Sequence, residues 1–299
     1  MDYFLQQAMN AFSLGGEYAL LALGLAIVFS VMGLVNFAHG ELITVGGYAM
    51  FFAVLIFGVK NPFLILPVGV LAAILFALLL ERVAFRPVRA APPTTGMLMA
   101  FGVSIILQNS ALLFVGTRPK AVPTAEWLMF DLNFGSLRIP VVQLLETGIT
   151  VLAIMLLVVF MRRTTIGMAM RAAAKDFSTV RLMGIRANRV VSTAFAISGL
   201  LAGLAAVFIM ARRGAVDPFM GFTPVLKAFV AAVVGGFGSL PGAVIGGFAL
   251  GIAEVALQAA LPSSVAGFRD AFIFSAIAVL LLFRPQGILG ERPDFGEKT

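Results

Sequence analysis

The sequence contains no cysteine and a single histidine in 299 residues. Without cysteine the chain can form no disulfide and no thiolate metal site, and it has no thiol nucleophile. One histidine also excludes a multi-histidine metal site. Charged residues are scarce as well, at 12% of the chain against about 25% in an ordinary soluble domain. These absences exclude disulfide-bonded folds and predict no metal centre.

Hydrophobic residues make up 61% of the sequence, and the mean hydropathy is +1.04. One water-soluble core cannot bury that much apolar side chain, so most of the surface must face lipid. We therefore predict an all-α, polytopic helical membrane protein in which residues 1–299 form a single transmembrane domain. A shorter apolar run, 225–237, is expected to be a half-helix or a re-entrant segment, which gives about eight to nine membrane segments. The predicted full crossings are 11–32, 42–58, 63–81, 96–115, 139–161, 190–211, 242–260 and 268–283.

Basic residues outnumber acidic ones, 21 to 14, and they gather between the apolar runs. Two loops carry most of this excess, Glu81–Thr95 and Met161–Arg189. Loops rich in Lys and Arg are retained in the cytoplasm, so we expect both loops there and the intervening loop Gly116–Arg138 outside. A basic soluble protein would suggest a nucleic-acid partner, but here the charge serves orientation and no nucleic acid is expected.

Signatures of catalysis are missing from the sequence. It has no Gly-Lys dipeptide and therefore no P-loop for ATP. It also has no His-Glu-x-x-His and no Gly-x-Ser-x-Gly motif. We expect a chain that is not an enzyme and binds no cofactor, so that any ATP must be bound by partner subunits.

The first candidate site lies between two apolar runs and holds Asn36, Phe37, His39 and Glu41. Ionisable groups at membrane depth are costly and are functional candidates for that reason. We expect a polar break at Gly40 that unwinds a helix and lines a substrate pathway or gate. The alternative is an ordinary interfacial loop whose histidine is exposed to water.

The second candidate site is a glycine-rich break that no continuous helix would tolerate, because Pro removes a donor and Gly is a weak helix former. We expect a hinge or gate here, next to helices that pack closely through small residues spaced four apart. Packing alone is the alternative. The residues concerned are Gly235, Gly236, Gly238, Ser239, Pro241 and Gly242.

The third candidate site is the loop 162–189, which is too polar to cross lipid and is rich in helix-forming residues. We expect one short amphipathic helix at the cytoplasmic surface. Three interpretations stay open from composition: a docking face for another protein, a basic topology anchor, and a surface helix on anionic lipid.

Four further charges interrupt apolar runs, at Glu17, Glu146, Lys227 and Glu254. Each is compatible with a pathway lining and with an interfacial position whose charged head reaches water. These glutamates, together with Glu41, also motivate a different class of function, a self-sufficient secondary transporter driven by an ion gradient.

Several blocks of the sequence, in this order, resemble the H-type permease subunit of the bacterial high-affinity branched-chain amino acid ABC transporters of the Liv system. The resemblance covers nearly the whole chain. The blocks are Leu14–Leu20, Gly33–Glu41, Glu81–Arg89, Gly167–Ile185, Val234–Gly242 and Pro285–Gly290.

The resemblance implies a multi-pass subunit of the bacterial inner membrane that passes Leu, Ile or Val into the cytoplasm. It implies a second, homologous permease subunit, two cytoplasmic ATPase subunits that bind ATP, and a periplasmic substrate-binding protein as partners. Related permeases for urea or short amides share much of the pattern, so they are an alternative.

The resemblance also implies a role for 162–189, as the cytoplasmic coupling loop that contacts the ATPase. The family's Glu-Ala-Ala and Gly pattern is degenerate in this chain, where Arg171 stands in place of the acidic residue and the glycine is displaced. The implied coupling residues are Arg171, Ala172, Ala173, Asp176, Arg181 and Gly184.

Overall fold

The computed structural model describes residues 2–59, 61–89, 91–123, 128, 130–134, 137–262 and 264–290. Part of the predicted outer loop, including its lone tryptophan Trp127, lies outside these residues. The described elements are α1 (Asp2–Met32), α2 (His39–Phe57), α3 (Pro62–Leu80), the π-helical turn η1 (Glu81–Phe85), α4 (Arg86–Val88), α5 (Pro93–Phe114), β1 (Lys120–Ala121), β2 (Asp131–Phe134), β3 (Leu137–Pro140), α6 (Val141–Arg163), α7 (Thr165–Lys175), α8 (Phe177–Leu182), α9 (Ala187–Arg213), β4 (Ala215–Val216), α10 (Phe222–Gly235), α11 (Leu240–Ala260), the 3-10 turn η3 (Ala266–Phe268) and α12 (Arg269–Phe283).

Seven helices in the described part of the chain are long and apolar enough to cross a membrane, and they confirm seven of the predicted crossings. One of them runs from Phe63 through the π-helical turn to Val88. The eighth predicted crossing is α12, which has 15 residues. At 1.5 Å per residue it extends about 22 Å, less than the roughly 30 Å of hydrocarbon in a bilayer. The apolar run 225–237 lies in α10, a shorter helix of 14 residues.

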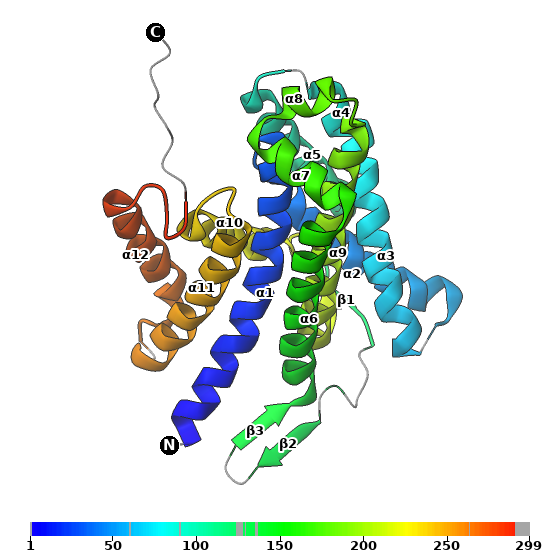
Figure 1. Ribbon diagram of the computed structural model, residues 1–299. Helices are drawn as coiled ribbons and strands as arrows, with labels where there is room; N and C mark the ends of the chain where they lie inside the picture. The colour runs from blue at the N-terminus through cyan, green and yellow to red at the C-terminus, as the bar shows by residue number, and fades with distance from the viewer. Residues whose placement is uncertain are drawn as a thin grey trace.

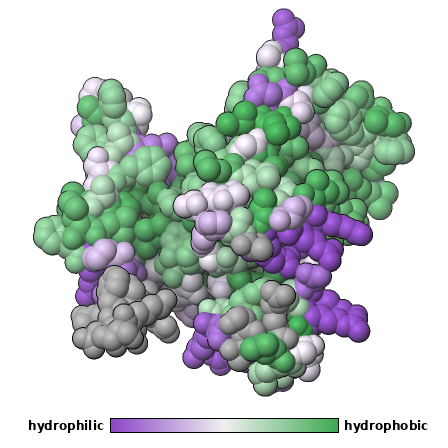
Figure 2. Space-filling view, turned by 90° about the horizontal axis from the view of Figure 1, so that it is seen from above, coloured by the Kyte–Doolittle hydropathy of each residue, from purple (hydrophilic) through white to green (hydrophobic). Residues whose placement is uncertain are grey.

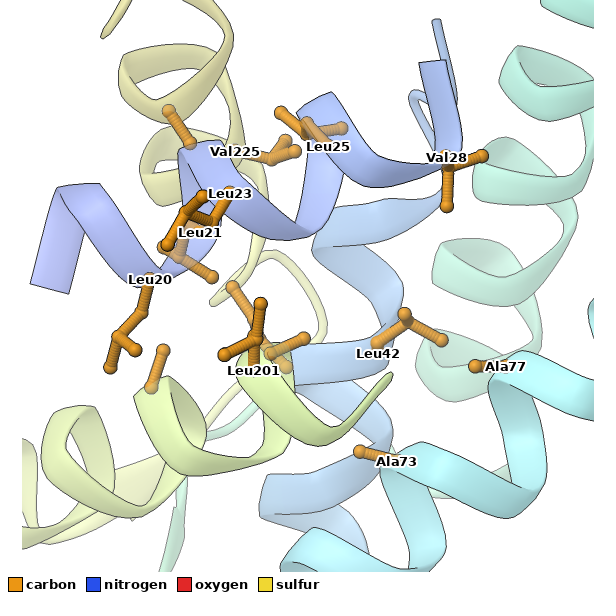
Figure 3. Packing of buried hydrophobic residues seen from close by; sticks show 14 of the residues in the cluster. Leu20, Leu21, Leu23, Leu25, Val28, Leu42, Ala73, Ala77, Leu201 and Val225 are labelled. Atoms are coloured by element: carbon orange, nitrogen blue, oxygen red, sulfur yellow. The ribbon is translucent and has the colours of Figure 1, made fainter. Parts of the chain in front are cut away.

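Helix α1 is the centre of the bundle, and it packs against α6, α9, α10 and α11 (Figure 1). In the most apolar stretch of α1, 83% of the residues are buried inside the protein, whereas in the most apolar stretch of α5 only 11% are. Figure 3 shows leucines of α1 interleaved with residues of neighbouring helices, such as Leu42 and Leu201. The helices packed around α1 therefore shield most of it, apart from its first turns, from lipid.

Glycines allow α11 to approach α1 closely. A Cβ at Gly247 would overlap the backbone of Ala19, and a Cβ at Gly251 would overlap the backbone of Gly15. Helices in lipid gain no hydrophobic drive toward one another, so close backbone contact through small residues is the main source of their association. The small-residue spacing predicted in this segment thus serves packing.

The two basic loops lie at one end of the bundle, as their shared charge predicts. Arg89 donates a hydrogen bond to the Asn188 side chain at 2.8 Å and forms an ion pair with Glu81. Ser192 donates to the same glutamate at 2.9 Å. Figure 1 places α4, α7 and α8 together at this end, with the N-terminus at the other. Figure 2, which looks onto this end, shows hydrophilic residues beside broad hydrophobic areas.

Two short β-ribbons lie in the described parts of the chain, and the sequence analysis did not predict them. Strands β2 and β3 pair antiparallel, and their hairpin leads into α6. Strands β1 and β4 also pair antiparallel and join the loop after α5 to the end of α9. Figure 1 places the hairpin of β2 and β3 at the end opposite the basic loops. The other ribbon packs against the bundle, where Val216 of β4 is fully buried next to Gly47 of α2.

Replacement of Gly247 by alanine should separate α1 from α11 and lower the free energy of unfolding by about 1–3 kcal/mol, the usual cost of overpacking a close contact. Gly102→Ala is the matched control, because a Cβ at that helical glycine meets nothing within 4 Å. We expect the control to change stability by no more than about 0.5 kcal/mol. Thermal unfolding of the detergent-purified variants measures the difference, and equal stabilities would contradict the packing described here.

Candidate functional site

The first candidate site lies inside the bundle, where α2 begins. The chain leaves the helical conformation after Met32 and re-enters it at His39. The imidazole of His39 lies 3.0 Å from the hydroxyl of Ser198, near the middle of α9. It also fills the space beside Gly24, where a Cβ would lie 2.6 Å from its Cε1 atom. His39 is 1% exposed, so the alternative of a water-exposed interfacial histidine is wrong.

The break lies at residues 33–38 rather than at Gly40, which corrects the prediction. Gly40 is in the first turn of α2, and a Cβ there would lie 2.6 Å from the backbone oxygen of Gly221. Thr44 accepts a hydrogen bond from the Gly221 amide at 3.2 Å. Because α10 begins at Phe222, the amino-terminal ends of two helices meet inside the bundle. The absence of a side chain at Gly40 makes that meeting possible.

Other residues of this site hold the surrounding helices together. Glu41 accepts hydrogen bonds from Ser104 at 2.8 Å and Gln108 at 2.7 Å, both on α5. Asn36 caps the turn before α2, because its side-chain oxygen accepts from the Ala38 amide at 3.0 Å. The Phe37 ring contacts aromatic rings of α5 and α10. The sequence identified these polar residues but not their partners, which come from distant helices.

The second candidate site is a turn between α10 and α11. Gly236 and Gly238 have φ angles of 109° and 88°, a conformation that favours glycine. Ser239 caps α11 by accepting a hydrogen bond from the Gly242 amide at 3.1 Å, and Pro241 stands in the first turn, where the missing donor costs nothing. Gly235 lies against Gly242, where a Cβ on either would overlap the other's backbone. The predicted interruption is therefore present.

The segment after α12 packs against this turn, which the sequence analysis did not foresee. The amides of Ile288 and Leu289 donate to the backbone oxygens of Val234 and Gly235 at 2.8 and 2.9 Å. They satisfy carbonyl groups that the end of α10 leaves without partners. Both segments contain glycines, which was the signal in the sequence that could have suggested the contact. Gly287 in the second segment has a φ of 75°.

The third candidate site consists of two helices rather than one, because the chain is extended at Asp176 between α7 and α8. Arg171 donates a hydrogen bond to the backbone oxygen of Met161 and fixes α7 to the end of α6. Ala173 is buried and Ala172 is exposed. Gly184, two residues after the end of α8, has a φ of 77°. The Arg181 side chain lies outside the described residues.

The tip of this loop exposes two large apolar side chains, Leu182 and Met183, which are 87% and 75% exposed. A cavity of about 560 Å³ lies between α7 and the glycine-rich turn. Arg171 and Lys175 line it on one side, and residues 237–241 line it on the other. The structure thus places the second and third candidate sites next to each other.

The charges that interrupt the apolar runs form two buried networks. In the first, Arg212 pairs with both Glu17 and Glu146, the latter at 2.6 Å. Ser13 also donates to Glu146, at 2.5 Å. This network joins α1, α6 and α9. Arg212, which closes it, ends an apolar helix and was not singled out from the sequence.

The second network joins α1, α10, α11 and α12. Lys227 lies 2.8 Å from Glu254 and 3.1 Å from Asp270. Arg269 lies 2.9 Å from Glu254, and the Tyr18 hydroxyl donates to the same carboxylate at 2.6 Å. Each buried charge of these two networks therefore has a partner of opposite sign, as groups removed from water require.

No group of three or more potential metal ligands occurs among the residues that the structure describes.

A family model described as the permease component of the branched-chain amino acid transport system matches residues 7–283. The chain belongs to this permease family. It is 38% identical to the high-affinity branched-chain amino acid transport system permease protein LivH of Escherichia coli K12, over 98% of this chain and 97% of the relative. It is 36% identical to BraD of Pseudomonas aeruginosa, with the same coverage.

LivM of Escherichia coli, a permease protein of the same system, is 26% identical over 91% of this chain and 67% of its own length. Family membership and the seven long apolar helices together identify a multi-pass membrane transport protein. The expected family and fold class are thus confirmed.

The natural absence of cysteine allows a direct test of the orientation of the bundle. Ala174→Cys should react with a membrane-impermeant maleimide added from the cytoplasmic side, because Ala174 is exposed at the basic end. Asn133→Cys, exposed on the hairpin of β2 and β3 at the opposite end of the bundle, should react only from the outside. Ser198→Cys is the buried control and should react from neither side. The reverse pattern for the first two variants would contradict the predicted orientation.

Proposed function

We propose that the protein is a membrane-spanning permease subunit of an ATP-driven ABC importer that translocates branched-chain amino acids into the cytoplasm across the bacterial inner membrane. The observation that carries the proposal is an identity of 36–38% to LivH and BraD over 98% of the chain. The proposed partners are a second, LivM-like permease subunit, two cytoplasmic ATPase subunits and a periplasmic substrate-binding protein. This chain performs no catalysis, and its partners bind the ATP.

The proposed division of labour follows the positions of the three candidate sites. The junction of α2 and α10 and the turn at 235–242 act as pathway or gate elements, because helix interruptions are where a bundle can rearrange with least loss of packing. The loop 162–189 transmits the movement of the ATPase. It faces the glycine-rich turn across the cavity of about 560 Å³, which supports that assignment.

Two alternatives carry less support. An ion-gradient-driven secondary transporter would use glutamates that bind and release a cation. Glu17, Glu146 and Glu254 are instead paired with arginine or lysine, and Glu41 accepts hydrogen bonds from two neutral side chains of α5. A permease for urea or short amides would share the same fold and subunits. Uptake of labelled urea and leucine by the same assembled complex separates that alternative from the proposal.

The experiment that tests the assembly is affinity purification of the tagged chain from detergent-solubilised native membranes, followed by mass spectrometry. The proposal predicts recovery of a second permease and of P-loop ATPases. Recovery of this chain alone, in a detergent that preserves a known ABC complex, would contradict it.

We expect Leu182→Asp to abolish copurification of the ATPase subunits while the permease pair stays assembled. The substitution places a charge in the exposed apolar tip of the proposed coupling loop, and a buried unpaired charge at an interface costs several kcal/mol. Phe130→Asp is the control, since Phe130 is also exposed but lies beside the hairpin at the opposite end. If the Leu182→Asp variant still copurified with the ATPase subunits, the tip would not be part of the coupling surface.

A further inference from the structure

A second cavity, of about 230 Å³, lies between the middle of α1, the last turns of α9 and the first turns of α10. It is smaller than the roughly 300–1,000 Å³ of pockets for drug-sized ligands, so its size suits a small metabolite. Charged or polar groups line it at Glu17, Tyr18, Arg212 and Lys227, and apolar groups line it at Leu14, Ile209 and Pro224.

The cavity lies between the two buried charge networks. Glu17 belongs to one network and Tyr18 to the other, and these consecutive residues of α1 point in different directions because a helix turns by about 100° per residue. The floor of the cavity is sheltered, since Glu17 and Lys227 are 4% and 6% exposed. Its rim is accessible, because Arg213 and Thr223 are exposed. A polar ligand can therefore reach buried charges of both signs.

Glu17 is the one carboxylate among the residues that line the cavity, whose cationic residues are Arg212, Arg213 and Lys227. Arg212 pairs with both Glu17 and Glu146, so one guanidinium serves two carboxylates. Of these two carboxylates only that of Glu17 lines the cavity. Among the residues that line the cavity, Glu17 is therefore the acceptor available to a ligand ammonium.

The side of the cavity at Lys227 favours an anion. An ammonium group has three donors, and the contacts of Lys227 to Glu254 and Asp270 account for two of them. The first turn of α10 lines the same side through Thr223 and Pro224. The amino-terminal end of a helix carries partial positive charge and stabilises a carboxylate nearby.

We propose that this cavity binds the head group of a zwitterionic α-amino acid, with the ammonium at Glu17 and the carboxylate at Lys227 and the first turn of α10. The apolar side chain of the amino acid then lies against Leu14 and Ile209. This inference rests on the proposed function and extends it, because it names the residues that hold the substrate inside the membrane domain. The pairs Glu17 with Glu146 and Lys227 with Arg269 are natural tests, since only the first member of each lines the cavity.

The test uses the complete complex of both permeases, ATPase subunits and binding protein in proteoliposomes, with a diazirine-bearing leucine analogue as the probe. Irradiation followed by mass spectrometry should place adducts on the peptides around Leu14, Ile209 and Pro224. Excess leucine should suppress these adducts. Labelling confined to other parts of the membrane domain, in a complex that takes up leucine, would overturn the inference and leave the proposed function intact.

Matched variants separate a ligand contact from a structural ion pair. Glu17→Gln and Lys227→Gln should each lower both the adduct yield and the rate of leucine uptake about tenfold, as loss of a hydrogen bond to a charged group implies. Glu146→Gln and Arg269→Gln disturb the same networks and should leave the adduct yield within about twofold of the parent protein. Equal losses for both members of each pair would show that the charges only hold helices together. Failure of the parent complex to take up leucine would instead refute the proposed function, and the inference with it.

Discussion

The constraint on which this structure depends is that polar groups inside a membrane must find their partners within the protein. Continuous helices satisfy it automatically, but this chain interrupts its helices at 33–38 and at 236–239. It also carries buried charges on several helices. Both features are tolerated because they lie around α1, enclosed by the outer helices (Figure 1). The arrangement of the bundle therefore follows from the need to shield polar elements that a simpler membrane protein would avoid.

Each interruption is stabilised by contacts from a distant part of the chain. The first is held by Ser198 and Thr44 at the junction of α2, α9 and α10. The second is held by the segment after α12, whose amides bind the end of α10. Glycines at both places let backbones meet where any side chain would intervene. A hinge that is held by a few hydrogen bonds can change its conformation at a lower cost in free energy than a closely packed helix pair. This property suits a transport pathway.

Much of the helical fold could be predicted from the sequence, because long apolar runs determine the membrane-spanning helices with little help from tertiary contacts. The candidate residues were also evident, since a histidine or a glycine-proline cluster is rare in an apolar chain. Their partners were not. Ser104, Ser198 and Arg212 are ordinary residues in sequence, and only the packing of α5 and α9 brings them to Glu41, His39 and Glu17. Hydropathy likewise could not reveal that α12 is too short for a perpendicular crossing, or that Asp176 divides the loop 162–189 into two helices.

The most direct test of the proposed transport function is leucine uptake by reconstituted proteoliposomes under two sources of energy. One preparation contains both permeases, the ATPase subunits and the binding protein with ATP, and the other contains this chain alone under a proton or sodium gradient. The account predicts ATP-dependent uptake by the first and none by the second. Uptake by the chain alone, driven by the ion gradient, would contradict it.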